Sequence, residues 1–185
     1  MANRLSLFIT FALWIAFTQS AFAEKYALLM GGSGEELEKD NFFKKDFERM
    51  KASLENRGWK VMVLFDGKKG DIAEARSATN VNIDAALKKY LQIVKPGDQM
   101  MTIAHAHGGR PDSRNARGHP ILTEDSVGYP TSKLQDFTNS ISKKAKSALL
   151  DFSCFSGNTQ RTTDLGDSGP PPSNYCIATG MTPTR

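Results

Sequence analysis

The chain has 185 residues and a formal net charge of +4, with 24 Lys and Arg against 20 Asp and Glu. Positive and negative residues are interspersed, as in EELEKDNFFKKDFERMK, which is typical of a solvated helix surface. This composition disfavours a nucleic-acid partner.

Residues 1–23 have the layout of a secretory signal, because Arg4 precedes an apolar stretch over residues 5–17 and an A-x-A cleavage site ends at Ala23. The apolar stretch is shorter than the roughly 20 residues that a transmembrane helix needs. We expect cleavage after Ala23 and a secreted or periplasmic protein with no stable membrane anchor. Removing 23 of 185 residues leaves 162, so residues 24–185 are expected to form one domain of charge +3.

The first half of this domain alternates strands and helices. An apolar strand over residues 25–31 ends in the turn GGSG. A helix is predicted over residues 35–57, where apolar side chains recur at mostly helical spacing before Gly58 ends the pattern. A second strand spans residues 59–65, and the polar residues 66–80 are predicted to form a loop.

The second half continues the alternation. In chain order it comprises a capped amphipathic helix (82–94), a strand leading into HAHGG (99–104), a loop (110–132), a helix (134–144), a strand (146–152), a loop (158–174) and a short fifth strand (175–179).

This alternation predicts right-handed crossovers and a mostly parallel sheet with helices on both faces, a three-layer α/β/α sandwich. Ligands bind beyond the carboxyl ends of the strands in such sheets. The segments GGSG, HAHGG and SCFSG each follow a strand directly, so all three are expected at the same edge. The sequence therefore predicts a site there.

A secreted protein with two cysteines raises the question of a disulfide between Cys154 and Cys176. Cys154 follows the carboxyl end of its predicted strand, whereas Cys176 lies near the amino end of the next. In parallel neighbours this offset exceeds the ~7 Å limit on the Cα separation of a disulfide. Both thiols are expected to be free, with Cys176 in the core.

Cys154 needs a base to act as a nucleophile, because a free thiol with a pKa of about 8.5 is mostly protonated at neutral pH. His107, at the end of the neighbouring strand, could supply that base. The backbone amides of Gly108 and of Cys154 itself are placed to bind a developing oxyanion.

A strand ending in His-Gly, followed by a second strand ending in D-x-x-C-x-S-G, resembles the caspase-like cysteine peptidases, the group of caspases, metacaspases, legumains and gingipains. KYALLMGGSG, IAHAHGG and LLDFSCFSG carry the resemblance over most of the mature chain. It implies a cysteine endopeptidase without a cofactor, acting on a peptide or protein substrate through an acyl-enzyme. His107 would be the catalytic histidine, Cys154 the nucleophile and Gly108 an oxyanion donor.

The same resemblance suggests further site residues. Metacaspases and legumains usually place an acid two positions before the cysteine, where it lines the substrate pocket. Phe152 stands at that position here, and Asp151 is one place earlier, so both are pocket candidates together with Ser33 in the first turn. Asn41 is a candidate for the Asn with which legumains orient the histidine.

The family sheet normally has a sixth strand, so five or six strands are expected. The sequence ends at Arg185, soon after the fifth predicted strand, which leaves open a truncated, minimal or inactive relative. The loop 158–174 lies where relatives are often cut during activation, and it offers Arg161, Asp164 and Asp167 as cleavage sites.

Two other functions remain open from the sequence. One is a non-catalytic binding or regulatory module that keeps the fold. The other is a metal-dependent hydrolase in which His105, His107 and His119 hold zinc and leave a position for water. In the peptidase, His105 would instead pack or form a hydrogen bond near the end of its strand.

Two motifs are disfavoured. GGSGEE lacks the final glycine of a dinucleotide fingerprint, and Glu35 and Glu36 would repel a phosphate. Ser153 and Ser156 do not fit the G-x-S-x-G pattern of serine hydrolases and are expected to be small residues of the turn around Cys154.

Overall fold

The computed structural model describes residues 23–32, 42–66, 72–109, 119–121, 123, 128–154, 156 and 175–179. Several predictions from the sequence fall on other residues: the first 22 residues of the signal, Ser33, Asn41, and the loop 158–174 with Arg161, Asp164 and Asp167 lie outside the described part.

The described strands form a six-stranded parallel sheet in the order β3-β2-β1-β4-β7-β8 and a two-stranded antiparallel ribbon of β5 and β6. The bounds of the sheet strands are β1 (Lys25–Gly32), β2 (Lys60–Asp66), β3 (Arg76–Ser77), β4 (Gln99–Ala106), β7 (Lys146–Asp151) and β8 (Tyr175–Thr179). The predicted three-layer α/β/α fold with a parallel sheet is confirmed.

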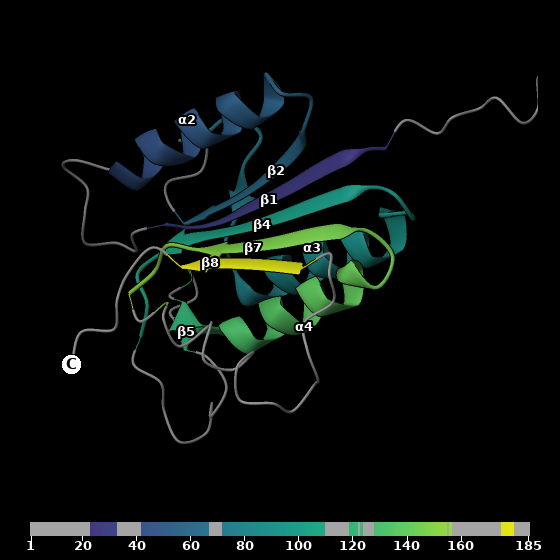
Figure 1. The fold of residues 1–185 in the computed structure, drawn as a ribbon. Helices are drawn as coiled ribbons and strands as arrows, with labels where there is room; N and C mark the ends of the chain where they lie inside the picture. The colour runs from purple at the N-terminus through teal and green to yellow at the C-terminus, as the bar shows by residue number, and fades with distance from the viewer. Residues whose placement is uncertain are drawn as a thin grey trace, which may run out of the picture.

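Helices cover both faces of this sheet. Helix α2 (Phe42–Glu55) lies on one face, and helices α3 (Asn80–Ile93) and α4 (Thr131–Ser142) lie together on the other (Figure 1). None of the helices that the structure describes is long and apolar enough to cross a membrane.

The two faces follow from the alternation of side chains along each strand. Along β1, Ala27 and Leu29 belong to a core beneath α2, whereas Leu28 and Met30 belong to the larger core beneath α3 and α4. Because β1 is buried on both faces, it reads as a continuous apolar run rather than an alternating one.

The helix boundaries depend on specific capping groups. Helix α2 ends before Gly58, whose φ of +79° lies in the left-handed region that glycine adopts readily, as predicted. Helix α3 begins at Asn80 rather than Asn82, because Thr79 is the N-cap and its side chain accepts a hydrogen bond from the Asn82 amide at 3.2 Å.

Two predicted loops contain short strands. The polar segment 66–80 contains the edge strand β3, which pairs with β2. The segment 110–132 contains β5 (Pro120–Ile121), β6 (Tyr129–Pro130) and the first residues of α4. Elements of two residues are held by tertiary contacts and give no periodic signal, so the sequence did not reveal them.

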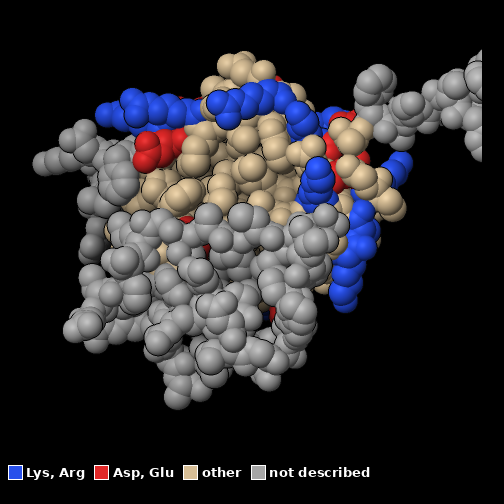
Figure 2. Space-filling model, in the orientation of Figure 1, with Lys and Arg blue, Asp and Glu red and all other residues tan. Residues whose placement is uncertain are grey.

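Many charged side chains lie over helix α2. In Figure 2, Lys and Arg gather along the upper edge, where α2 lies in Figure 1. Within α2 they alternate with acids, and Lys44–Glu48 and Lys51–Glu55 form ion pairs of 2.6 and 2.7 Å. This mixed pattern is that of a solvated helix face.

The strand order determines where a site is expected. From β1 the chain proceeds to β2 and β3 on one side, and it then returns to β4 on the other side of β1. The order therefore reverses between β1 and β4, and open α/β sheets bind ligands beyond the carboxyl ends of the strands at such a reversal. His107 is the first residue after β4.

Candidate functional site

Cys154 lies in a tight turn just beyond β7. The Phe152 amide donates to the carbonyl oxygen of Ala104 at 2.8 Å, which keeps the chain beside β4 for one residue after the strand. The chain then turns, with the Ser156 amide donating to the carbonyl oxygen of Ser153 at 3.2 Å. Cys154 is exposed and its thiol is free, as predicted.

The backbone of Cys154 lies directly against Gly108. A β-carbon added to Gly108 would overlap with the Cys154 carbonyl oxygen and would lie 2.9 Å from the carbonyl carbon and 3.1 Å from the amide nitrogen of Cys154. Real β-carbons essentially never approach other atoms this closely, so only glycine fits. The structure therefore brings together the ends of β4 and β7, as the sequence predicted for His107–Gly108 and Cys154.

His107 and His105 both lie against α2. The ring of Phe43 is 5.4 Å from the His107 ring in an edge-on arrangement and 4.8 Å from the His105 ring. The His105 ring is also stacked on Phe47 at 6.0 Å, and its Nε2 is 3.2 Å from Oδ2 of Asp46. His105 thus packs and forms a hydrogen bond near the end of β4, as expected if it is not a metal ligand.

Phe152 presents an aromatic surface beside the cysteine. The residue is 38% exposed. Its ring meets the His105 ring edge-on, with 6.2 Å between the centroids. Phe152, a candidate for the substrate pocket, is therefore accessible to a ligand.

Asp151 does not line an accessible pocket. It is 1% exposed, and its Oδ1 accepts hydrogen bonds from the amide of Ser153 at 3.0 Å and from the Ser153 hydroxyl at 2.6 Å. Along β7 the residue shares a face with Leu149, which belongs to the core beneath α3 and α4. Its assignment as a pocket residue is corrected: the carboxylate faces inward because side chains alternate along the strand.

His119 completes a buried polar group with Ser153 and Asp151. Its Nε2 lies 2.7 Å from the Ser153 hydroxyl oxygen and 3.5 Å from Oδ2 of Asp151, and its side chain is fully buried. Burial lowers the pKa of His119 below its ordinary value of 6.5, and the negative charge of Asp151 partly opposes this effect. His119 is therefore neutral in the folded protein near pH 7.

The β5–β6 ribbon holds His119 in place. The Gly109 amide donates to the carbonyl oxygen of Pro120 at 2.8 Å, and Gly108 forms a bridge with Ile121. At the other end, His119 and Thr131 exchange two hydrogen bonds of 2.9 and 3.0 Å. The ribbon thus connects the glycines after β4 to the start of α4.

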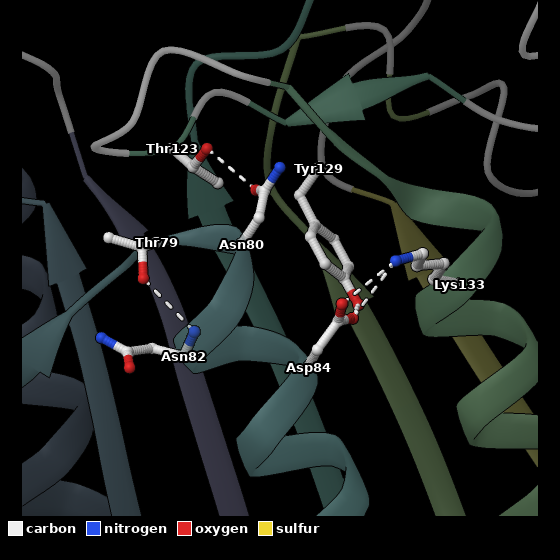
Figure 3. Close-up of polar contacts among 7 residues, drawn as sticks. All are labelled: Thr79, Asn80, Asn82, Asp84, Thr123, Tyr129 and Lys133. Atoms are coloured by element: carbon white, nitrogen blue, oxygen red, sulfur yellow. Dashed lines mark hydrogen bonds and ion pairs between the residues drawn. The ribbon is translucent and has the colours of Figure 1, made fainter.

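Side chains of α3 and α4 fix the ribbon further (Figure 3). Asn80 accepts from the hydroxyl of Thr123 at 3.1 Å, and Asp84 accepts from the hydroxyl of Tyr129 at 2.7 Å and pairs with Lys133 at 3.2 Å. Burial, together with the hydrogen bond to Asp84, raises the pKa of Tyr129 well above its usual value. Its hydroxyl remains a donor over the physiological pH range.

The three-histidine zinc site is not formed. His105 lies on the α2 face of the sheet, whereas His119 is buried beside Asp151 on the opposite face. Across the described ranges, no three His, Cys, Asp or Glu side chains are close enough to hold a metal ion.

Cys176 is separated from Cys154 by the register of the sheet. In the parallel pairing of β7 and β8, Cys176 is opposite Ala148, near the start of β7. From Ala148 to the end of β7 at Asp151 the chain advances about 10 Å, at ~3.3 Å per residue, and Cys154 follows beyond that. The backbone positions of Cys154 and Cys176 are therefore too far apart for a disulfide.

The contact between His119 and Ser153 was missed by the sequence analysis. Ser153 and Ser156 are buried in the turn, as expected of small residues. However, the hydroxyl of Ser153 also joins a histidine 34 positions away. In the sequence, this contact is represented only by a histidine beside Pro120 in a predicted loop. That pattern is too weak to predict that His119 and Ser153 interact.

No family model matches this chain, and no curated protein matches it. Among solved structures, it is similar to a crystal structure of a protein from Geobacter sulfurreducens, with a TM-score of 0.54 and 21% sequence identity. The match covers 70% of this chain and 50% of that chain, so this chain spans half the length of that protein. This likeness supports the α/β/α fold and carries no functional assignment.

Proposed function

We propose that this protein is a cysteine endopeptidase of the caspase-like type, exported by its signal sequence and using Cys154 as nucleophile and His107 as base. The observation that carries the proposal is the contact between Gly108 and the backbone of Cys154 at the carboxyl ends of two adjacent strands. Cys154 has a free, exposed thiol, and its backbone lies against the glycine of a His-Gly pair, which supplies the components that thiol acyl transfer needs.

The proposed reaction begins with transfer of the Cys154 thiol proton to the His107 imidazole. The thiolate attacks the peptide carbonyl carbon, and the oxyanion is stabilised by the amides of Gly108 and Cys154. The Gly109 amide already donates to the carbonyl oxygen of Pro120. The proposed oxyanion donor is the amide of the preceding residue, Gly108, so the two roles do not compete. Protonated His107 then gives its proton to the leaving amine, which departs as the thioester acyl-enzyme forms.

Water completes the cycle. His107 accepts a proton from water as the water oxygen attacks the thioester carbonyl, and the carboxylic acid product leaves as Cys154 recovers its proton. Phe152 provides an accessible apolar surface for the substrate side chain that precedes the cut bond. The substrate is therefore a peptide or protein segment that can lie along this edge of the sheet.

The test is labelling and turnover with the purified protein. We expect a peptidyl acyloxymethyl ketone to label Cys154 and a peptide pool to be cleaved. Cys154→Ala should abolish both, and His107→Ala should slow both by about 10²- to 10⁴-fold, the usual contribution of a general base. Cys176→Ala is the matched control, because it removes the other thiol near the start of the β7–β8 pairing.

Three results would contradict the proposal. The first is a folded wild-type protein that neither cleaves peptides nor reacts with the ketone, which would favour a binding module. The second is labelling of Cys154 that is unchanged by His107→Ala. The third is hydrolysis that survives Cys154→Ala and is lost with a chelator, which would favour metal chemistry.

A further inference from the structure

A buried chain of three polar side chains lies directly behind the Cys154 turn. We propose that His119, Ser153 and Asp151 form a positioning network that fixes the orientation of Cys154. The inference rests on the proposed function in that it takes Cys154 to be the reactive group. None of the three residues is more than 1% exposed, so none of them contacts substrate.

The hydrogen bonds of the network have a defined direction. The Ser153 hydroxyl carries one proton, which it donates to Oδ1 of Asp151 at 2.6 Å. Its oxygen must therefore accept the contact at 2.7 Å from Nε2 of His119. This assigns the proton of neutral His119 to Nε2, and the network runs from His119 through Ser153 to Asp151.

This arrangement fixes the residue just before Cys154 at two atoms. Both the amide and the hydroxyl of Ser153 donate to Oδ1 of Asp151. The Ser153 side chain and the peptide plane between Phe152 and Ser153 cannot then rotate independently. The next peptide plane, between Ser153 and Cys154, is held because its carbonyl oxygen accepts from the Ser156 amide at 3.2 Å. Gly108 packs against the backbone of Cys154 as well. Cys154 is thus held between the network and the end of β4, with its thiol facing solvent.

Stability alone does not explain this choice of residues. Burying polar groups costs free energy that well-packed apolar residues of the same size avoid. The preceding strand offers a comparison: Ser147 is buried on β7, and within the described residues its hydroxyl has no hydrogen-bond partner. Ser153, in the turn after β7, therefore differs from a buried serine whose hydroxyl makes no hydrogen bond.

The position of His119 is itself fixed by its backbone. It exchanges two hydrogen bonds with Thr131 at the start of α4. Because the His119 side chain is also fully buried, the imidazole has little freedom, and its Nε2–H is aimed at Ser153 before any substrate binds. Such preorganisation is what a nucleophile turn requires, since misplacement by about 1 Å can cost two orders of magnitude in rate.

The experiment measures the rate of Cys154 alkylation by iodoacetamide against pH, followed by mass spectrometry. This small reagent reports the thiolate without needing a substrate cleft. The variants are Ser153→Ala, His119→Leu and His119→Gln, with Ser147→Ala as the matched control. Circular dichroism at each pH confines the comparison to folded protein.

We expect wild type, Ser147→Ala and His119→Gln to share one pH midpoint, because Gln retains an N–H donor for Ser153. Ser153→Ala and His119→Leu should move the midpoint away from the wild-type value and lower the alkylation rate at pH 7 by about three-fold or more, because a displaced thiol loses its position relative to the His107 base. The proposal is overturned if Ser153→Ala behaves like Ser147→Ala, or if His119→Gln and His119→Leu are equally impaired.

The outcomes for the two proposals are separable. A wild-type protein that reacts with iodoacetamide at Cys154 but not with the peptidyl ketone contradicts the peptidase. The pH midpoints of the variants still decide the positioning network in that case. Conversely, a labelled and active enzyme whose variants all keep the wild-type midpoint contradicts the network and leaves the peptidase standing.

Discussion

Gly108 packs so closely on Cys154 that no side chain fits between them. The contact joins the first turn after β4 to the turn after β7, two segments more than 40 residues apart in the chain. Because β4 and β7 are parallel neighbours, both turns emerge at the same edge of the sheet. The register of β4 against β7 therefore determines whether Gly108 and Cys154 meet.

Replacing Gly108 with Ala should therefore displace the Cys154 turn. The added methyl group meets backbone atoms that cannot move aside, and we expect a loss of about 1–3 kcal/mol in the free energy of unfolding, as for overpacked sites. Labelling of Cys154 by the peptidyl ketone should fall by at least about ten-fold. Urea denaturation and mass spectrometry measure the two effects.

Gly58→Ala is the control for this substitution. A β-carbon added to Gly58 would meet nothing within 4 Å, but the φ of this residue is +79°, so alanine costs about 1–2 kcal/mol through backbone strain alone. Labelling of Cys154 should be normal in that variant. Normal labelling in Gly108→Ala as well would mean that the contact does not position the nucleophile.

The pH dependence of stability should reveal the buried state of His119. Because burial lowers its pKa below 6.5 in the folded protein, the unfolded chain binds the proton more readily. The stability that depends on neutral His119 is present above pH 6.5 and is lost as the pH falls below it, at up to about 1.4 kcal/mol per pH unit.

His119→Gln removes this titration. We expect the difference in unfolding free energy between wild type and His119→Gln to be constant from about pH 7.5 to 8.5, and to move against wild type below the ordinary pKa of histidine. Urea titrations at each pH provide the measurement. A wild type that gains stability over the variant at pH 5 would instead indicate a charged His119 paired with Asp151.

The ribbon should be held chiefly by Tyr129. Its hydroxyl donates to a carboxylate of Asp84 at 2.7 Å, whereas the comparable hydroxyl of Tyr90 reaches the carbonyl oxygen of Ala27 at 3.4 Å. Hydrogen bonds to charged groups are the stronger ones. Tyr129→Phe should cost about 1 kcal/mol more than Tyr90→Phe by urea denaturation. Equal costs would show that Asp84 contributes no net stability here.

Much of the architecture was predictable because it depends on local patterns. The apolar runs of β1, β2, β4, β7 and β8 and the amphipathic period of α3 specify the layers, and parallel strands bring HAHGG and SCFSG to the same edge. The two-residue strands were not predictable, since tertiary contacts alone define them. Asp151 was assigned to the substrate pocket from the sequence, but its side chain faces inward, and its partner His119 is placed by a ribbon within a segment predicted to be loop.

Phe152 should influence which substrates are accepted rather than whether the thiol reacts. Because Phe152 is 38% exposed, Phe152→Ala should cost only about 1–2 kcal/mol in stability. Peptidyl ketones that differ only in the residue before the electrophile should label the variant at changed relative rates. The rate should fall most for ketones with a large apolar residue at that position. The iodoacetamide rate at Cys154 should stay the same, since this reagent does not need the pocket.

Phe152→Asp provides the complementary change, placing an acid two positions before the cysteine. A carboxylate there favours a cationic substrate side chain through charge-assisted hydrogen bonds, so ketones with Arg or Lys before the electrophile should gain relative to Phe152→Ala. Phe152→Asn, of similar size without the charge, separates the electrostatic gain from the change in volume. Identical preferences across wild type and the three variants would exclude Phe152 from the substrate pocket.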